Sequence, residues 1–373
     1  MHVNEKIIPN RPIVNSSPKS QTKPRASHAV GSTPKRPSEP EVPSWKDLCQ
    51  SLSELGFKRG YLRDTVLPSW WEPEVVKTRN GFLETAMLVH RRTGLPLAPL
   101  FAGRAEPASA KSNVRFKKSK GVTEDAVRTA HLIARQVAET VAASTQLPFK
   151  GELPSAAELH SLLKDRGRQP WVALDDLLDY CREIGIPVVH TSQFPAGARK
   201  PDGMAVCSQE GRPVIVLCKA SQRPAWMVFI LAHELGHIVL GHVPEGGAVV
   251  DGNLEAASGE EEERQANEFA SVLLTGKPDL GLSSHGPMKA GTLARAAQDF
   301  ARRYRVSPGV AALNWGFNTG NWPVANGAVK ILEGNQNALE MIQRSTASGL
   351  DWDSVSEDAA EWLESMAGIR QPK

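Results

Sequence analysis

The apolar positions of the chain recur mainly at helical spacing, with one group of shorter, strand-like runs among them. Near the start of this pattern, Trp45, Leu48, Leu52 and Leu55 share one helix face, and Gly56 ends the run. Further periodic stretches predict helices near 82–89, 123–144, 155–166, 171–184, 224–240, 259–275, 288–305, 308–315, 323–345 and 354–366. The expected fold class is therefore α+β and mostly helical.

Three short apolar runs in the middle of the chain predict the strands of a small β-sheet. They lie in "IPVVHTS" and in "GMAVCSQEGRPVIVLCK", where a Gln-Glu-Gly turn separates two runs and predicts a hairpin. The second hairpin strand, "RPVIVLCK", has two interpretations. It is either a plain core strand or an edge strand that binds an extended substrate by strand addition.

Composition divides the chain into five segments. Residues 1–43 are rich in Pro, Ser, Lys and Arg, and we expect them to be disordered because they have too few apolar residues to form a core. We predict a small helical domain at 44–101, which is a candidate helix-turn-helix relative or partner-binding module. A basic linker at 102–121, a larger α+β domain at 122–316 and a C-terminal helical segment at 317–373 follow.

The net charge of +3 hides an asymmetry between the two parts of the chain. Residues 1–150 hold 24 Lys and Arg against 13 Asp and Glu, whereas the remainder holds 20 against 28. A basic first half is suited to nucleic acid or to an acidic partner surface. The alternative is a basic tail together with solvated helix faces. The Trp70–Trp71 pair in the helical domain is more typical of a core than of a DNA contact.

The sequence favours a cytoplasmic protein without a membrane partner. No apolar run approaches the roughly 18 residues of a membrane helix, and "MHVNEKIIPN" lacks the apolar stretch of a secretory signal. The four cysteines show no paired spacing, so we expect reduced thiols.

The chemistry is concentrated in "ILAHELGHIVLGH", residues 230–242. His233 and His237 are one helical turn apart and therefore direct two imidazoles to one point, with Glu234 beside the first. This is the HExxH pattern of two zinc ligands and a general base. The flanking residues are apolar all round the helix, so we expect it to be buried. Two hydrogen-bonded core histidines are the alternative.

A hydrolytic zinc site usually has three protein ligands and one open position for water. His242 follows His233 by nine residues, which does not match the metzincin spacing. We interpret it as a helix cap or as a group behind the ligands, with ligation as the weaker alternative.

A second candidate segment for the third ligand is "SGEEEERQANEFASVLLTG". Ser258 and Glu261 predict a capping box at the start of this helix. Glu262 and Glu263 both lie close to its apolar stripe, and periodicity does not separate them.

"LAHELGHIVLGH" followed by "ERQANEFASVLL" resembles the ImmA/IrrE metallopeptidases, and the preceding hairpin resembles theirs as well. The likeness covers about residues 155–275 and continues more weakly to about 315. It implies that Glu263 is the third zinc ligand, four residues before Asn267 in the family pattern. Asn267 would then support a ligand from one turn away, and 122–316 would be a zincin-like metallopeptidase domain.

The resemblance implies a zinc-dependent endopeptidase with Zn²⁺ on His233, His237 and Glu263, and with Glu234 as general base. The expected partner is a protein substrate, namely a helix-turn-helix transcriptional repressor in a prophage, mobile-element, toxin–antitoxin or stress-response setting. Two alternatives remain open. One is a DNA-binding or antitoxin-like regulator with a structural zinc site, and the other is a toxin or defence effector protease of broader specificity.

Overall fold

A five-stranded sheet lies at the centre of the fold, in the order β1-β5-β3-β4-β2. The computed structural model describes residues 42–106, 114–115, 124–244, 248–250 and 256–372. The strands are β1 (Val114–Arg115), β2 (Val188–His190), β3 (Gly203–Cys207), β4 (Pro213–Leu217) and β5 (Ala248–Val250). Strand β3 pairs antiparallel with β4 and β5, and β2 pairs parallel with β4. The predicted strands and hairpin are thus confirmed.

The hairpin strand β4 is a central strand, and its suggested role as an open edge is wrong. It pairs with β3 on one side and β2 on the other, and all five of its residues are buried. Its side chains alternate between the two faces: Val214 and Val216 enter one hydrophobic core, whereas Ile215 and Leu217 enter another. A strand that is buried on both faces has a continuous run of apolar residues, as β4 does.

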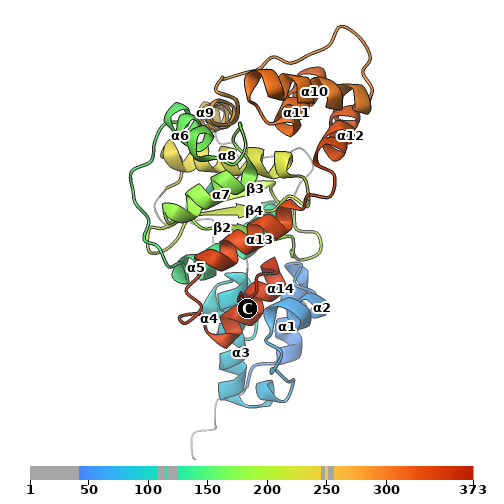
Figure 1. The fold of residues 1–373 in the computed structure, drawn as a ribbon. Coiled ribbons are helices and arrows are strands. Elements are labelled where there is room, and N and C mark those ends of the chain that lie inside the picture. The colour runs from blue at the N-terminus through green and yellow to red at the C-terminus, as the bar shows by residue number, and fades with distance from the viewer. Residues whose placement is uncertain (1–41, 107–113, 116–123, 245–247, 251–255, 373) are drawn as a thin grey trace, which may run out of the picture. The chain divides into compact units, whose positions relative to one another are not determined.

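The helices divide between the two faces of the sheet (Figure 1). One core contains residues of α6 (Ala156–Arg166), α7 (Leu174–Glu183), α8 (Pro224–Val239), α9 (Ala256–Thr275) and α13 (Ala338–Gly349). On the opposite face, the other core contains α5 (Glu124–Ala143) together with the helices of the N-terminal region. The predicted α+β, mostly helical class is confirmed.

The N-terminal helical region shares its core with the last helix of the chain. Its elements are α1 (Trp45–Glu54), α2 (Arg59–Tyr61), η1 (Leu62–Val66), η2 (Val75–Lys77), α3 (Arg79–Thr93) and α4 (Leu97–Phe101). Helix α14 (Glu357–Ala367) lies beside them and adds Trp362, Leu363 and Met366 to their core (Figure 1). Polar contacts tie the same elements, including Trp70 Nε1 to Asp358 Oδ1 at 2.9 Å. Trp70 is exposed, so it is not the core residue that its sequence position suggested.

The C-terminal residues are spread over three parts of the fold. Helix α11 (Pro308–Thr319) continues past residue 316, and α12 (Trp322–Glu333) packs on α11 and α10 (Ala290–Tyr304) in a third core. The single helix predicted for 323–345 is wrong, because α12 ends at Glu333, Gly334 follows with φ +55°, and Asn337 caps the new helix α13. Helix α13 then contacts β2 and α7.

Candidate metal centre

Helices α8 and α9 form the frame of the site, and their close approach depends on one glycine of the motif. A methyl group at Gly236 would lie 3.1 Å from Cβ of Phe269, which is tighter than an ordinary contact. Phe269, Ala270 and Leu273 of α9 share the core with Leu231 and Leu235 of α8. The first turn of α8 contains Pro224, as expected, and its Ala225 N–H donates to Oε1 of Glu333.

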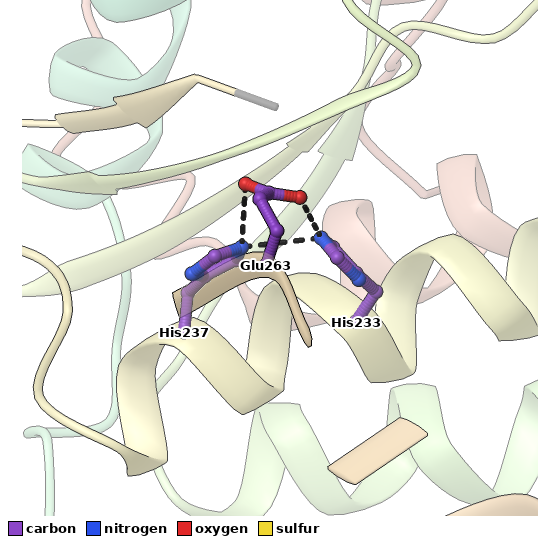
Figure 2. A group of neighbouring side chains, drawn as sticks. All are labelled: His233, His237 and Glu263. Atoms are coloured by element: carbon purple, nitrogen blue, oxygen red, sulfur yellow. Dashed lines mark hydrogen bonds and ion pairs between the residues drawn. The ribbon is translucent and has the colours of Figure 1, made fainter. Parts of the chain in front are cut away.

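His233, His237 and Glu263 converge on one point between these helices (Figure 2). The two Nε2 atoms are 3.1 Å apart, and the carboxylate oxygens of Glu263 lie 3.4 Å from Nε2 of His233 and 3.5 Å from Nε2 of His237. Both histidines are buried, and Glu263 is half-buried. The structure thus brings together the three residues that the sequence named as candidate ligands.

This donor set fits a divalent metal such as zinc. Two ligands at about 2.0–2.2 Å from a tetrahedral ion lie about 3.3–3.6 Å from each other, and the observed separations fall in or close to that range. Two imidazoles and one carboxylate are also the donors of several hydrolytic zinc sites. The three side chains would leave one position of a four-coordinate ion for water.

Asn267 fixes the orientation and tautomer of His233. Nδ1 of His233 donates to Oδ1 of Asn267 at 3.1 Å, so the ring proton is on Nδ1 and the lone pair of Nε2 faces the cluster. Asn267 follows Glu263 by one turn of α9, the position given by the sequence. One face of α9 therefore provides both the candidate ligand Glu263 and Asn267, which orients the candidate ligand His233.

A longer chain of hydrogen bonds fixes His237. The side-chain nitrogen of Gln265 donates to Glu261 at 2.9 Å, so the amide oxygen of Gln265, Oε1, faces His242. Nε2 of His242 donates to that oxygen at 3.0 Å, so its Nδ1 accepts from Nδ1 of His237 at 3.0 Å. The lone pair of His237 Nε2 consequently faces His233 and Glu263. His242 thus lies directly behind a candidate ligand, the position expected for a supporting group.

Charge and burial are consistent with this arrangement. Burial lowers the pKa of His242 and outweighs its hydrogen bond to Gln265, which favours the neutral ring that the chain of bonds requires. Burial alone would raise the pKa of Glu263, but hydrogen bonds and charge interactions with His233 and His237 bring it well below its usual range. Glu263 is therefore a carboxylate at neutral pH.

The carboxylate of Glu234 is completely buried against the start of β3. A methyl group at Gly203 would lie 2.5 Å from Oε1 of Glu234 and 2.6 Å from Cγ2 of Ile230. Only glycine leaves room for the glutamate at this position, so Gly203 belongs to the site although no spacing in the sequence indicated it.

Other sequence candidates fall outside the group. Glu262 is not part of the His–His–Glu cluster, and helix α9 begins at Ala256, so the predicted cap at Ser258 is wrong. Gln265 was missed because its role depends on the approach of His242 from the segment that follows α8.

The site and the family comparison together indicate a metallopeptidase-type domain. Residues 181–315 match the model of the Peptidase_M78 family, described as the IrrE N-terminal-like domain, and this part of the chain is an ImmA/IrrE family metallopeptidase domain. The match extends from the end of α7 into α11 and leaves out α1–α6 and α12–α14. No curated protein matches the sequence. Among the described residues, no helix has the length and apolar character needed to cross a membrane.

Proposed function

We propose that the chain is a zinc-dependent endopeptidase that hydrolyses a peptide bond in a protein partner. The observation that carries this proposal is the convergence of two imidazoles and one carboxylate, whose ligand atoms all lie within 4.8 Å of one another. When bound, the ion supplies Lewis-acid chemistry, which polarises a peptide carbonyl and lowers the pKa of a water molecule.

The roles of the side chains follow from their positions. His233, His237 and Glu263 would hold the ion. Glu234, next to His233, takes a proton from the attacking water and passes it to the leaving amine. Asn267 and His242 keep the ligand rings in the tautomers that present Nε2.

The substrate that we propose is a helix-turn-helix transcriptional repressor, cut in a prophage, mobile-element, toxin–antitoxin or stress-response setting. Support for this part comes from the likeness to the ImmA/IrrE family. We expect the reaction in the cytoplasm. The basic residues of the N-terminal half would then assist recognition of an acidic partner or of nucleic acid bound to it.

A regulator with a purely structural zinc site is less well supported. Structural sites normally have four protein ligands, whereas the group among the described residues has three, and Glu234 is the sequence neighbour of one of them. A base next to an open coordination position has no use in a structural site.

The decisive experiment combines metal analysis with cleavage mapping. We expect about one zinc per chain in wild type and in Glu234→Gln, with proteolysis lost only in the variant. Proteomic mapping of new termini, with products of neighbouring genes added as purified substrates, identifies the partner. Equal cleavage by both proteins, or absence of zinc from the wild type, would contradict the proposal.

A further inference from the structure

A pocket of about 670 Å³ opens directly beside the candidate metal centre. Glu263 and Asn267 form part of its lining, so it lies on the side of the cluster where Asn267 supports His233. Its volume falls within the roughly 300–1,000 Å³ typical of ligand pockets. The pocket is therefore large enough for side chains of a polypeptide that approaches the cluster.

One wall of the pocket is apolar and comes from three helices. Trp226 and Phe229 belong to α8, Leu313 and Phe317 to α11, and Trp322 begins α12. Phe317 is 73% exposed, although an exposed phenyl ring is unfavourable in water. A large apolar surface that faces a pocket is typical of a binding site.

The aromatic wall has a fixed geometry. The rings of Trp226 and Trp322 pack with centroids 5.4 Å apart, and Trp226 donates to Asn326 Oδ1 at 2.9 Å. Gly316 allows this packing, because a methyl group there would lie 2.5 Å from Cβ of Ala325 and 3.3 Å from Trp322. These contacts hold the two indole rings in place before any ligand binds.

The polar part of the lining carries an excess of negative charge. Among its described residues are the carboxylates Glu260, Glu263, Glu268 and Asp279, against the single guanidinium of Arg264. Arg264 is already paired with Glu268 at 2.8 Å and with a glutamate one turn before it. Glu260 and Asp279 therefore leave the pocket with a field that attracts cations.

We infer that this pocket selects the substrate segment next to the scissile bond. One large apolar side chain of the substrate binds against the aromatic wall. A lysine or arginine beside it binds at Glu260 and Asp279, which form the acidic rim of the pocket. The inference rests on the proposed endopeptidase function and adds the chemistry of its substrate. Phe317 and Trp322 lie beyond the residues that match the family, so the C-terminal part of this chain adds two aromatic side chains to the wall.

A cleavage experiment tests the wall. The zinc-loaded full chain digests a proteome-derived peptide library, with Glu234→Gln as the blank. We expect cuts next to large apolar residues that have a lysine or arginine within two positions. Phe317→Ala and Trp322→Ala should reduce the preference for a large apolar residue over alanine by about tenfold. Ile331→Ala, which removes an exposed apolar side chain of α12 outside the pocket, should leave the profile unchanged.

The acidic rim is tested separately with Asp279→Asn and Glu260→Gln. Both changes keep the shape and remove one charge, so we expect the enrichment of lysine and arginine to fall while the apolar preference remains. Active variants of Phe317 and Trp322 with the wild-type profile would overturn the inference and leave the endopeptidase proposal intact.

A binding experiment keeps the test independent of proteolysis. The probe is a fluorescein-labelled glycine-rich peptide with a central phenylalanine between two lysines, titrated into zinc-loaded Glu234→Gln. We expect at least about tenfold tighter binding than for analogues with alanine at the centre or glutamates at the flanks, and loss of this difference in Trp322→Ala. Selective binding without cleavage by wild type would refute the endopeptidase and keep the pocket assignment. Equal binding of all three peptides would overturn the assignment.

Discussion

Each face of the central sheet buries histidine, yet the two environments differ completely. On the α8 face, His233 and His237 meet a carboxylate from a second helix and polar partners behind each ring. On the α5 face, His131 is equally buried, but its Nδ1 faces the thioether sulfur of Met204 at 3.1 Å. Burial alone therefore does not make a histidine a metal ligand, and convergence with other donors does.

The contrast is carried by adjacent residues of a single strand. Gly203 makes room for Glu234 on one face of β3, and the side chain of its neighbour Met204 contacts His131 on the other. Successive residues of a strand point to opposite faces, so one dipeptide serves a polar site and an apolar core.

The largest effect that we expect comes from removing the converging carboxylate. Glu263→Gln should weaken zinc binding by more than about a hundredfold, beyond the 10–100-fold typical of groups behind the ligands. His131→Leu should leave zinc binding unchanged. Competition with a chromogenic chelator measures both affinities. Equal loss of zinc affinity in Glu263→Gln and His131→Leu would contradict the claim that convergence with other donors makes a buried histidine a metal ligand.

Gly203→Ala should act on catalysis and leave the metal in place. The added methyl group cannot coexist with Oε1 of Glu234 at 2.5 Å, so the carboxylate must move. A displacement of about 1 Å can lower kcat by about a hundredfold. Zinc content measured alongside peptide cleavage separates this effect from metal loss. Gly211→Ala, at an open turn position, is a control for a generic glycine effect, although its positive φ costs some stability.

Loss of the hydrogen-bond chain behind His237 should have a smaller effect on the metal. His242→Phe keeps an aromatic ring and removes the acceptor for Nδ1 of His237. We expect about tenfold weaker zinc binding. The exposed His285→Phe provides a matched control and should bind zinc like wild type. Unchanged affinity in His242→Phe would show that the His237 tautomer needs no support.

A separate effect concerns the dependence of stability on pH. Burial, followed by the charge of Arg135, lowers the pKa of His131 to about 3, from about 6.5 in the unfolded chain. Between these two pKa values the unfolded state therefore binds one proton more than the folded state. The free energy of unfolding is highest above about pH 6.5 and falls as the pH decreases. The loss by pH 5 should be about 2 kcal/mol.

His131→Leu should remove this part of the pH dependence. Urea unfolding at about pH 7 and about pH 5, with a chelator present so that metal release does not contribute, measures the difference. A variant whose stability falls as steeply as that of wild type would exclude His131 as the source.

The sequence predicted the site better than it predicted the surroundings of the site. The spacing of His233 and His237 determines their direction on any helix, so no tertiary information was needed. Periodicity left Glu262 and Glu263 unresolved, because they differ by one residue on the same face. The family pattern favoured Glu263, and the packing of α9 on α8 places it in the cluster.

What the sequence did not predict depends on contacts between distant segments. Strands β1 and β5 contain two and three residues, too few for an alternating pattern. The roles of Gly203 and Gln265 arise only when β3 and α9 approach α8. The helical pattern of 323–345 continued through Gly334, because a break of four residues scarcely disturbs the apolar spacing.

The docking of α14 on the N-terminal helices has a consequence for the order of folding. Ser69 and Trp70 bond to residues 292 and 288 positions later in the chain. During synthesis, helices α1–α4 therefore remain without the apolar face of Trp362, Leu363 and Met366 until nearly the whole metallopeptidase domain has emerged. Contacts of such high sequence separation form late and slowly. The core of the N-terminal helical region can therefore be completed only after α14 has been synthesised. A chain cut short before α14 would expose a hydrophobic surface to chaperones and proteases.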